Sequence, residues 1–216
     1  MINDKQFEAC YTRKLKFDAT TFDESIWRKC QAAEIKSFWS GDVAPPERHA
    51  QARVVWTDEA LCVRFDGAQH EPLITGHTTQ TATKTIGLWN RDVCEVFLAP
   101  FEDEPYKYFE FEVAPTGEWL DLALEFHETG RKTDWDYASG MQVLTRVATH
   151  EICLMMRVEW RALRVACPKA GDVWRVNFFR CIGGDEMTRY LAWRPTRTAK
   201  PNFHIPDAFG ELRFQA

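Results

Sequence analysis

Hydrophobic and polar residues alternate with a period of two along most of this chain, and helical periodicity is scarce. Such alternation is typical of strands whose successive side chains point to opposite faces of a sheet. Gly, Pro and Asp residues at 57–59, 115–117 and 183–185 predict tight turns between the strands. About ten strands are predicted, at 53–57, 60–66, 92–99, 106–114, 118–124, 142–148, 151–159, 173–180, 189–193 and 211–214.

These elements predict an all-β fold: a jelly-roll-like sandwich of two antiparallel sheets, with about ten strands and long loops. The polar segments 67–88 and 127–140 are predicted loops, and 161–165 is a predicted helical turn. No repeat or linker interrupts the chain, so we expect one domain over 1–216 with a core from about 17 to 214. The first residues are either frayed or an added edge strand.

Composition narrows the choice of partners. The formal net charge of −5 gives no attractive field for a nucleic acid or an anionic membrane. No apolar run reaches the ~20 residues that cross a bilayer, and no signal peptide is visible. The seven cysteines form no C-x-x-C unit and are expected to be reduced. We therefore expect a soluble, cytoplasmic protein that binds neither nucleic acid nor membrane.

The strand at 108–113 places acidic residues on one face and apolar residues on the other. If its hairpin neighbour points leucines inward, an outer surface of rings and carboxylates results. That surface is either an ordinary solvated face or a platform on which rings stack against sugars and carboxylates bind hydroxyls. The predicted inward residues are Phe109, Phe111, Val113, Leu120, Leu122 and Leu124, and the outward ones are Tyr108, Glu110, Glu112, Trp119 and Asp121.

Other charged positions leave two interpretations open. Glu95 falls between Val93 and Phe97, an unfavourable place for a charge unless it is paired or binds a ligand. Arg91 and Asp92 either form a structural ion pair or hold a cation and orient a site. Arg175 and Asn177 alternate onto one strand face with Phe179, where they either read sugar hydroxyls or are surface polar groups.

Two motifs carry a resemblance to a known family. Trp89, Asp92, Glu95 and Phe97 spell W-x-x-D-x-x-E-x-F, and residues 203–210 spell F-H-I-P-D-A-F-G. Together with the hairpin at 52–63, they resemble the family 9 carbohydrate-binding modules and their DOMON-superfamily relatives, in the right order over roughly 20–214. The resemblance implies the same β-sandwich and a non-catalytic protein that binds a mono- or oligosaccharide.

In those modules two aromatic rings clamp a terminal sugar beside polar residues. The resemblance implies Trp89 and Phe203 as the rings and Glu95 as the carboxylate, with His204 within reach of the sugar. Phe203 stands where the binding members have Trp, and Glu112 where they can carry a basic residue. Related proteins often hold structural calcium, but no contiguous Asp-rich loop identifies such a site here.

Three alternatives stay open. A glycosidase would use paired carboxylates drawn from Glu95, Glu110, Glu112 and Asp121. A haem-binding relative would use Met and His ligands, but no spacing singles out a pair among Met141, Met155, Met156, His150 and His204. The aromatic-rich face is also compatible with a protein partner, including a separate catalytic enzyme that the domain would serve.

Overall fold

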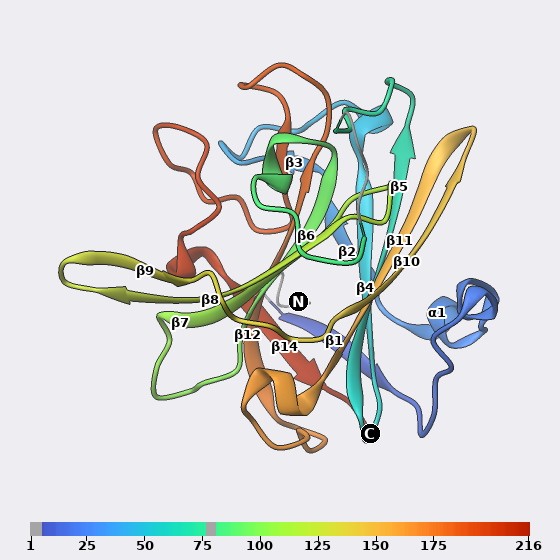
Figure 1. Cartoon of the computed structure of the whole chain (residues 1–216), viewed down its shortest axis with the longest axis vertical. Helices are drawn as coiled ribbons and strands as arrows, with labels where there is room; N and C mark the ends of the chain where they lie inside the picture. The colour runs from blue at the N-terminus through green and yellow to red at the C-terminus, as the bar shows by residue number, and fades with distance from the viewer. Residues whose placement is uncertain (1–5, 77–80) are drawn as a thin grey trace.

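The computed structural model describes residues 6–76 and 81–216, and in these ranges the chain is nearly all β (Figure 1). Each of the predicted strands is present, although most ends move by a few residues. They are β4 (Ala50–Trp56), β5 (Ala60–Gln69), β6 (Val93–Ala99), β7 (Lys107–Val113), β8 (Trp119–His127), β10 (Gln142–Ala148), β11 (His150–Glu159), β12 (Val173–Cys181), β13 (Tyr190–Ala192) and β14 (Gly210–Phe214).

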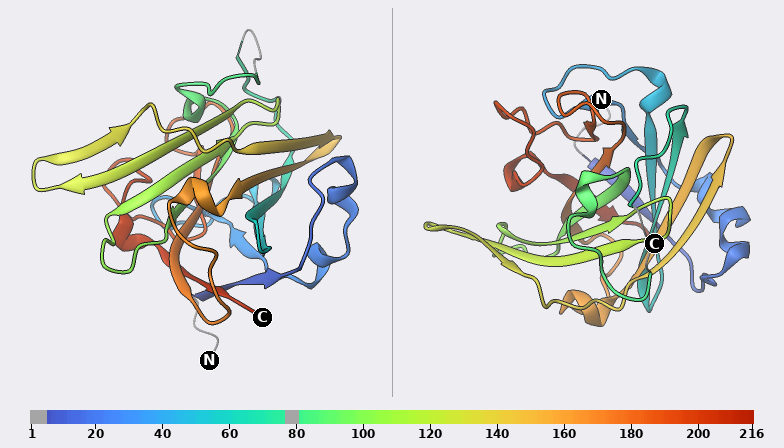
Figure 2. Two further views of the ribbon diagram at one scale, coloured as in Figure 1. Left: turned by 60° about the horizontal axis from the view of Figure 1, so that its bottom comes forward. Right: turned by 45° about the horizontal axis from the view of Figure 1, so that its top comes forward.

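Three further strands were not predicted: β2 (Ala33–Ile35), β3 (Ser37–Phe38) and β9 (Gly130–Asp134). Another, β1 (Gln6–Tyr11), corresponds to the added N-terminal strand that was one of two alternatives for the first residues. β9 lies inside the predicted loop 127–140, and its polar sequence is held by antiparallel pairing with β8. The β8–β9 hairpin projects from the body of the molecule (Figure 2). Of the predicted loop 67–88, residues 77–80 lie outside the described residues.

The helical elements are short. They are α1 (Ile26–Lys29) and the 3-10 turns η1 (Ala19–Asp23), η2 (Pro46–Arg48), η3 (Leu88–Asn90), η4 (Trp160–Leu163) and η5 (Pro206–Ala208). The predicted turn at 161–165 corresponds to η4. Within the described ranges, no helix has the length and apolar character needed to span a membrane.

The strands form a sandwich that is continuous through one shared strand. The order β10-β11-β5-β4-β1-β14-β12-β6-β7-β8-β9 runs through both layers without closing into a barrel. β1 pairs in parallel with β14 through its first half and with β4 through its second half. The sheet is therefore mixed and not purely antiparallel, and the N-terminal strand is neither frayed nor at an edge.

Apolar side chains from both layers fill the space between them. Phe178 of β12 is fully buried and meets Phe7 of β1 edge to face at 5.5 Å and Phe65 of β5 at 6.2 Å. Phe109, Phe111 and Val113 point into this core, as predicted. This burial of rings and branched side chains is what holds the two layers together.

The other face of β6, β7 and β8 is also covered, so these strands are buried on both sides. Cross-strand partners share a face, and Glu110 pairs with Leu122 while Phe111 pairs with Asp121. The prediction for β8 was therefore wrong: Leu120, Leu122 and Leu124 lie on the carboxylate face, and Trp119 and Asp121 lie on the core side. Asp121 is stabilised there by Lys84 at 2.9 Å and by Ser139.

Candidate functional site

A pocket of about 270 Å³ lies on the second face of β6–β8, close to the lower end of the range for small-molecule sites. The sheet supplies its floor, and the hairpin end of β9, the turn η3 and the segment 201–204 supply its walls. It is lined by Trp89, Glu95, Phe97, Glu110, Leu122, Leu124, Arg131, Thr133, Trp135, Cys181, Tyr190, Pro201, Asn202, Phe203 and His204.

Trp89 reaches the pocket because the chain before β6 is held in a fixed turn. Gly87 adopts φ 82°, which a side-chain-bearing residue rarely takes, and η3 follows directly. Behind it, Asp92 accepts hydrogen bonds from the backbone N–H groups of Ile74 and Gly183. Asp92 thus anchors the turn and is not paired with Arg91.

Arg91 instead forms an ion pair with the buried Glu118 carboxylate, with Nη1 and Oε1 2.6 Å apart. The spacing of Trp89 and Asp92 in the motif therefore reflects one local structure, in which the acid fixes the turn that presents the ring. Arg91 and Asp92 therefore do not form a mutual ion pair, and both oxygens of Asp92 accept hydrogen bonds from within the protein.

Phe203 forms part of the opposite wall. Its ring stacks on Phe179 of β12, with centroids 4.0 Å apart and planes at 15°, and meets Tyr190 edge to face at 5.6 Å. Only 8% of Phe203 is exposed. One face of this ring is therefore occupied by protein, and the remaining exposed part borders the pocket.

Trp135, just after β9, is a pocket ring that the sequence did not single out. It is 46% exposed, and its ring centroid lies 6.5 Å from that of Trp89 at an angle of 44°. An exposed indole at the mouth of a pocket offers stacking surface for a ligand. Its position depends on the pairing of β9 with β8, which the pattern of apolar residues in the sequence does not predict.

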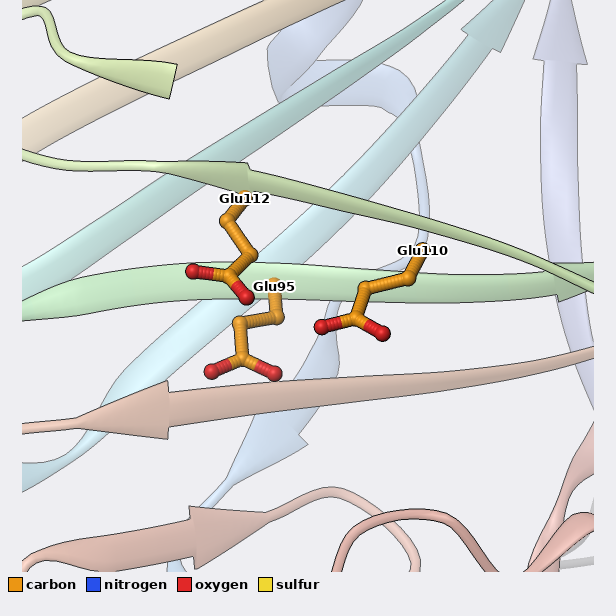
Figure 3. Close-up of side chains that lie close together, drawn as sticks. All are labelled: Glu95, Glu110 and Glu112. Carbon is orange, nitrogen blue, oxygen red and sulfur yellow. The ribbon is translucent and has the colours of Figure 1, made fainter. Parts of the chain in front are cut away.

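Three carboxylates converge at the pocket floor: Glu95 of β6 and Glu110 and Glu112 of β7 (Figure 3). One oxygen of each lies within 4.8 Å of the other two. Glu95 and Glu110 line the pocket, whereas Glu112 lies behind them and is 0% exposed. This grouping follows from the register, because Glu95 of β6 is the cross-strand partner of Glu112 of β7.

The three carboxylates have few hydrogen-bond donors. Glu95 accepts from the Cys181 thiol at 3.4 Å, and both oxygens of Glu112 and Oε2 of Glu110 have no partner among the described residues. Burial and the neighbouring Glu110 raise the pKa of Glu95, and burial together with Glu95 and Glu110 raises the pKa of Glu112. Burial raises the pKa of Glu110 to about 7.

His204 lies beside the acids as a neutral ring. Burial, with the nearby Arg131 charge, lowers its pKa to about 3. Its Nδ1 is 2.8 Å from the Tyr108 hydroxyl and 4.0 Å from Glu110 Oε2. Because the ring is uncharged at neutral pH, the approach to Glu110 is not an ion pair, and His204 offers the pocket hydrogen-bonding and ring surface only.

Arg175 and Asn177, two of the predicted binding residues, lie away from the pocket and from the carboxylate group. Arg175 donates to the backbone carbonyls of Pro105 and Pro206, so it joins two loops. Asn177 is buried, donates to the Arg194 carbonyl and accepts from the Arg194 N–H. Both share a face with Phe179 as predicted, but their polar atoms are used to hold the chain that covers the sheet.

The remaining predicted residues are brought together. Trp89, Glu95, Phe203 and His204 line one pocket although they come from segments more than a hundred residues apart. Glu112 belongs to the same carboxylate group without lining the pocket. The residues that sequence reasoning missed are Trp135, Arg131 and Cys181; the methionines considered for haem do not line it, and Met155 and Met156 are fully buried.

A family model described as Carbohydrate-binding family 9 matches residues 27–214. The chain belongs to this family. A curated relative, an "Extracellular protein" of Arthroderma benhamiae, is 26% identical over 176 residues, which cover 75% of this chain and 77% of that protein.

Solved structures of family 9 and related proteins share the fold. A putative carbohydrate-binding protein from Bacteroides uniformis matches with a TM-score of 0.77 at 15% identity, covering 98% of this chain and 99% of that one. A family 9 module from Caldicellulosiruptor kristjanssonii, solved with glucose and with cellotriose, matches with TM-scores of 0.61 and 0.63 at 16% identity. Those matches cover 98% of this chain and 96% and 94% of the module's chains.

Proposed function

We propose that this protein is a non-catalytic carbohydrate-binding module whose sugar site is the pocket between Trp89, Trp135 and Phe203. The single observation that carries the proposal is the juxtaposition of indole rings and carboxylates around one hollow on a family 9 fold. Rings stack on the apolar C–H faces of a sugar, and carboxylates accept hydrogen bonds from its hydroxyls. The family 9 module of known structure with glucose or cellotriose supports a saccharide ligand.

The arrangement of the acids favours binding over hydrolysis. A retaining glycosidase needs one ionised carboxylate as nucleophile and one protonated acid about 5–5.5 Å away. Here burial and the neighbouring acids raise the pKa of Glu95 and Glu112, and burial raises that of Glu110 to about 7, so no acid of the group has the lowered pKa that favours a nucleophile. Asp121, the fourth candidate acid, lies on the opposite face of the sheet.

Titration calorimetry of the whole chain with glucose and cellotriose tests the proposal. We expect saturable binding in the parent and its loss in Trp89→Ala, with Tyr106→Ala as the control because Tyr106 is an exposed aromatic outside the pocket. No heat at millimolar sugar, with Trp89→Ala indistinguishable from the parent, would overturn it. Release of aryl groups from aryl glycosides above blank would show an enzyme instead.

A further inference from the structure

The pocket floor combines three acidic side chains with few hydrogen-bond donors, and this combination affects which sugar the pocket would bind. Glu112 is fully buried, and both of its oxygens are without a hydrogen-bond partner among the described residues. Glu110 adds one more orphaned oxygen at the pocket surface. A buried acceptor left unpaired is destabilising, so without a ligand these atoms share a proton between Glu112 and Glu110, and a ligand with a strong donor would take its place.

Charge balance at the pocket floor favours a cationic donor. Arg131 lies at the pocket and acts on Glu110, and Arg189 acts on Glu95, so two cationic side chains face three carboxylates. Every influence on Glu112 comes from burial or from the two neighbouring acids, and none comes from a cation. Full ionisation of the three carboxylates would leave one negative charge without a partner, which agrees with their raised pKa values in the ligand-free pocket.

A single positive charge at the floor would complete this balance. One oxygen of each carboxylate lies within 4.8 Å of the other two. Two acceptors bonded to one tetrahedral ammonium at about 2.7–2.9 Å stand about 4.4–4.7 Å apart. That separation lies within the 4.8 Å limit, so an ammonium can contact Glu95 and Glu110 beside Glu112; Figure 3 shows the three side chains together.

We propose that the pocket selects a sugar bearing a free primary amino group, a hexosamine, whose ammonium binds the carboxylates of Glu95 and Glu110 with Glu112 behind them. This inference rests on the proposed sugar-binding function. The rings of Trp89 and Trp135 hold the sugar body, and the acids distinguish the amino sugar from its neutral counterparts. A neutral hydroxyl donates one hydrogen bond and leaves the charge uncompensated.

A divalent metal ion fits this floor less well. Calcium takes six to eight oxygen ligands, and these three carboxylates supply at most six, of which one already accepts from Cys181. A doubly charged ion would also leave the group of acids and arginines with an excess positive charge in a buried place.

Calorimetry of the full chain with glucosamine, glucose, N-acetylglucosamine and calcium chloride tests the inference. We expect glucosamine to bind about fivefold more tightly than either neutral sugar, because a charge-assisted hydrogen bond contributes about twice as much as a neutral one. Glu112→Gln should bring the affinity for glucosamine close to that for glucose, and it leaves the residues that line the pocket unchanged. Glu211→Gln, an exposed position on β14, is the matched control and should keep it. The N-acetylglucosamine comparison uses the parent alone and stands even if Glu112→Gln fails to fold.

The outcomes separate this inference from the proposed function. If glucose binds in a Trp89-dependent manner at least as tightly as glucosamine, the inference fails and sugar binding stands. If the preference survives unchanged in Glu112→Gln, the acids are not its origin and the inference also fails. Calcium binding that is lost in Glu112→Gln, with no glucosamine preference, would make the floor a metal site. If none of the sugars binds, the proposed function itself is overturned.

Discussion

The Phe203 ring lies parallel to that of Phe179, with centroids 4.0 Å apart and planes at 15°. Phe203 comes from the loop before β14 and Phe179 from the middle of the sheet, so this stack fixes a loop residue to a strand. A ring that is rigidly backed in this way presents its free edge and face to a ligand with little loss of conformational entropy.

Replacing Phe203 by leucine should separate stacking from volume filling. Phe203→Leu keeps an apolar side chain in the wall but removes the ring, so sugar affinity should fall about two- to tenfold. The free energy of unfolding should fall by no more than about 1.5 kcal/mol. Calorimetry and urea denaturation measure the two effects. Unchanged affinity would remove Phe203 from the binding surface and leave it as a structural residue.

Trp135 should matter for binding and little for stability. Because the side chain is 46% exposed, Trp135→Ala removes pocket surface but little buried area. The free energy of unfolding should therefore change by no more than about 0.5 kcal/mol. Sugar affinity should fall as it does for Trp89→Ala. Tyr106→Ala is the matched control, since Tyr106 is 47% exposed and does not line the pocket. Equal effects of the two substitutions would contradict this role.

The ligand-free protein should lose stability as pH rises from 6.5 to 8. The pKa of Glu110 is about 7 in the folded chain against 4.5 for the unperturbed group, so the folded state binds more protons between these values. The stabilisation, on the order of 3 kcal/mol in all, is complete below 4.5 and is lost as pH rises through 7. Below 6.5, His204 acts in the opposite sense, because its folded pKa is lowered to about 3. Urea denaturation at pH 6.5, 7 and 8 measures how the free energy of unfolding changes with pH. A free energy that rises with pH over this range would contradict the prediction.

Glu112→Gln should stabilise the ligand-free protein at pH 8 and have a smaller effect at pH 6.5. The substitution removes a buried acid whose ionised form has no hydrogen-bond donor, and an amide of the same shape carries no charge. Thermal unfolding of both proteins at both pH values tests this, with Glu211→Gln as the exposed control. A lower melting temperature at pH 8 would mean that the Glu112 carboxylate is paired in the folded protein.

Arg180 should be among the residues most sensitive to substitution. Its buried guanidinium donates to the backbone carbonyls of His49 and Ala68 at 3.0 and 2.6 Å, and to the Gln69 side chain at 2.8 Å. Arg180→Met would remove these buried hydrogen bonds and should lower the free energy of unfolding by about 3 kcal/mol or more. Urea denaturation checks the value. The exposed Arg213→Met should change it by less than about 0.5 kcal/mol.

The sequence by itself determined the strands with strong alternation, their turns and the two motifs that place Trp89, Glu95 and Phe203 in order along the chain. These features are local, since period-two patterning and turn residues act within a few positions. Pattern could not reveal β9, because Arg131, Lys132 and Thr133 are polar and become a strand only by pairing with β8. A strand at the N-terminus was one of the expected alternatives, but the position of β1 inside the sheet was not predictable, because its parallel partners lie far along the sequence.

Only the tertiary structure decided which residues meet in the pocket. Strand register, which alternation does not specify for a sheet buried on both faces, put the leucines of β8 on the same side as Glu110 and paired Glu95 with Glu112. The tertiary structure also brings Trp135 beside Trp89. Arg175 and Asn177 form hydrogen bonds with backbone groups instead of lining the pocket. The chemical groups of each side chain follow from the sequence, but burial and neighbouring charges set their pKa values. Both arise only when distant segments pack together.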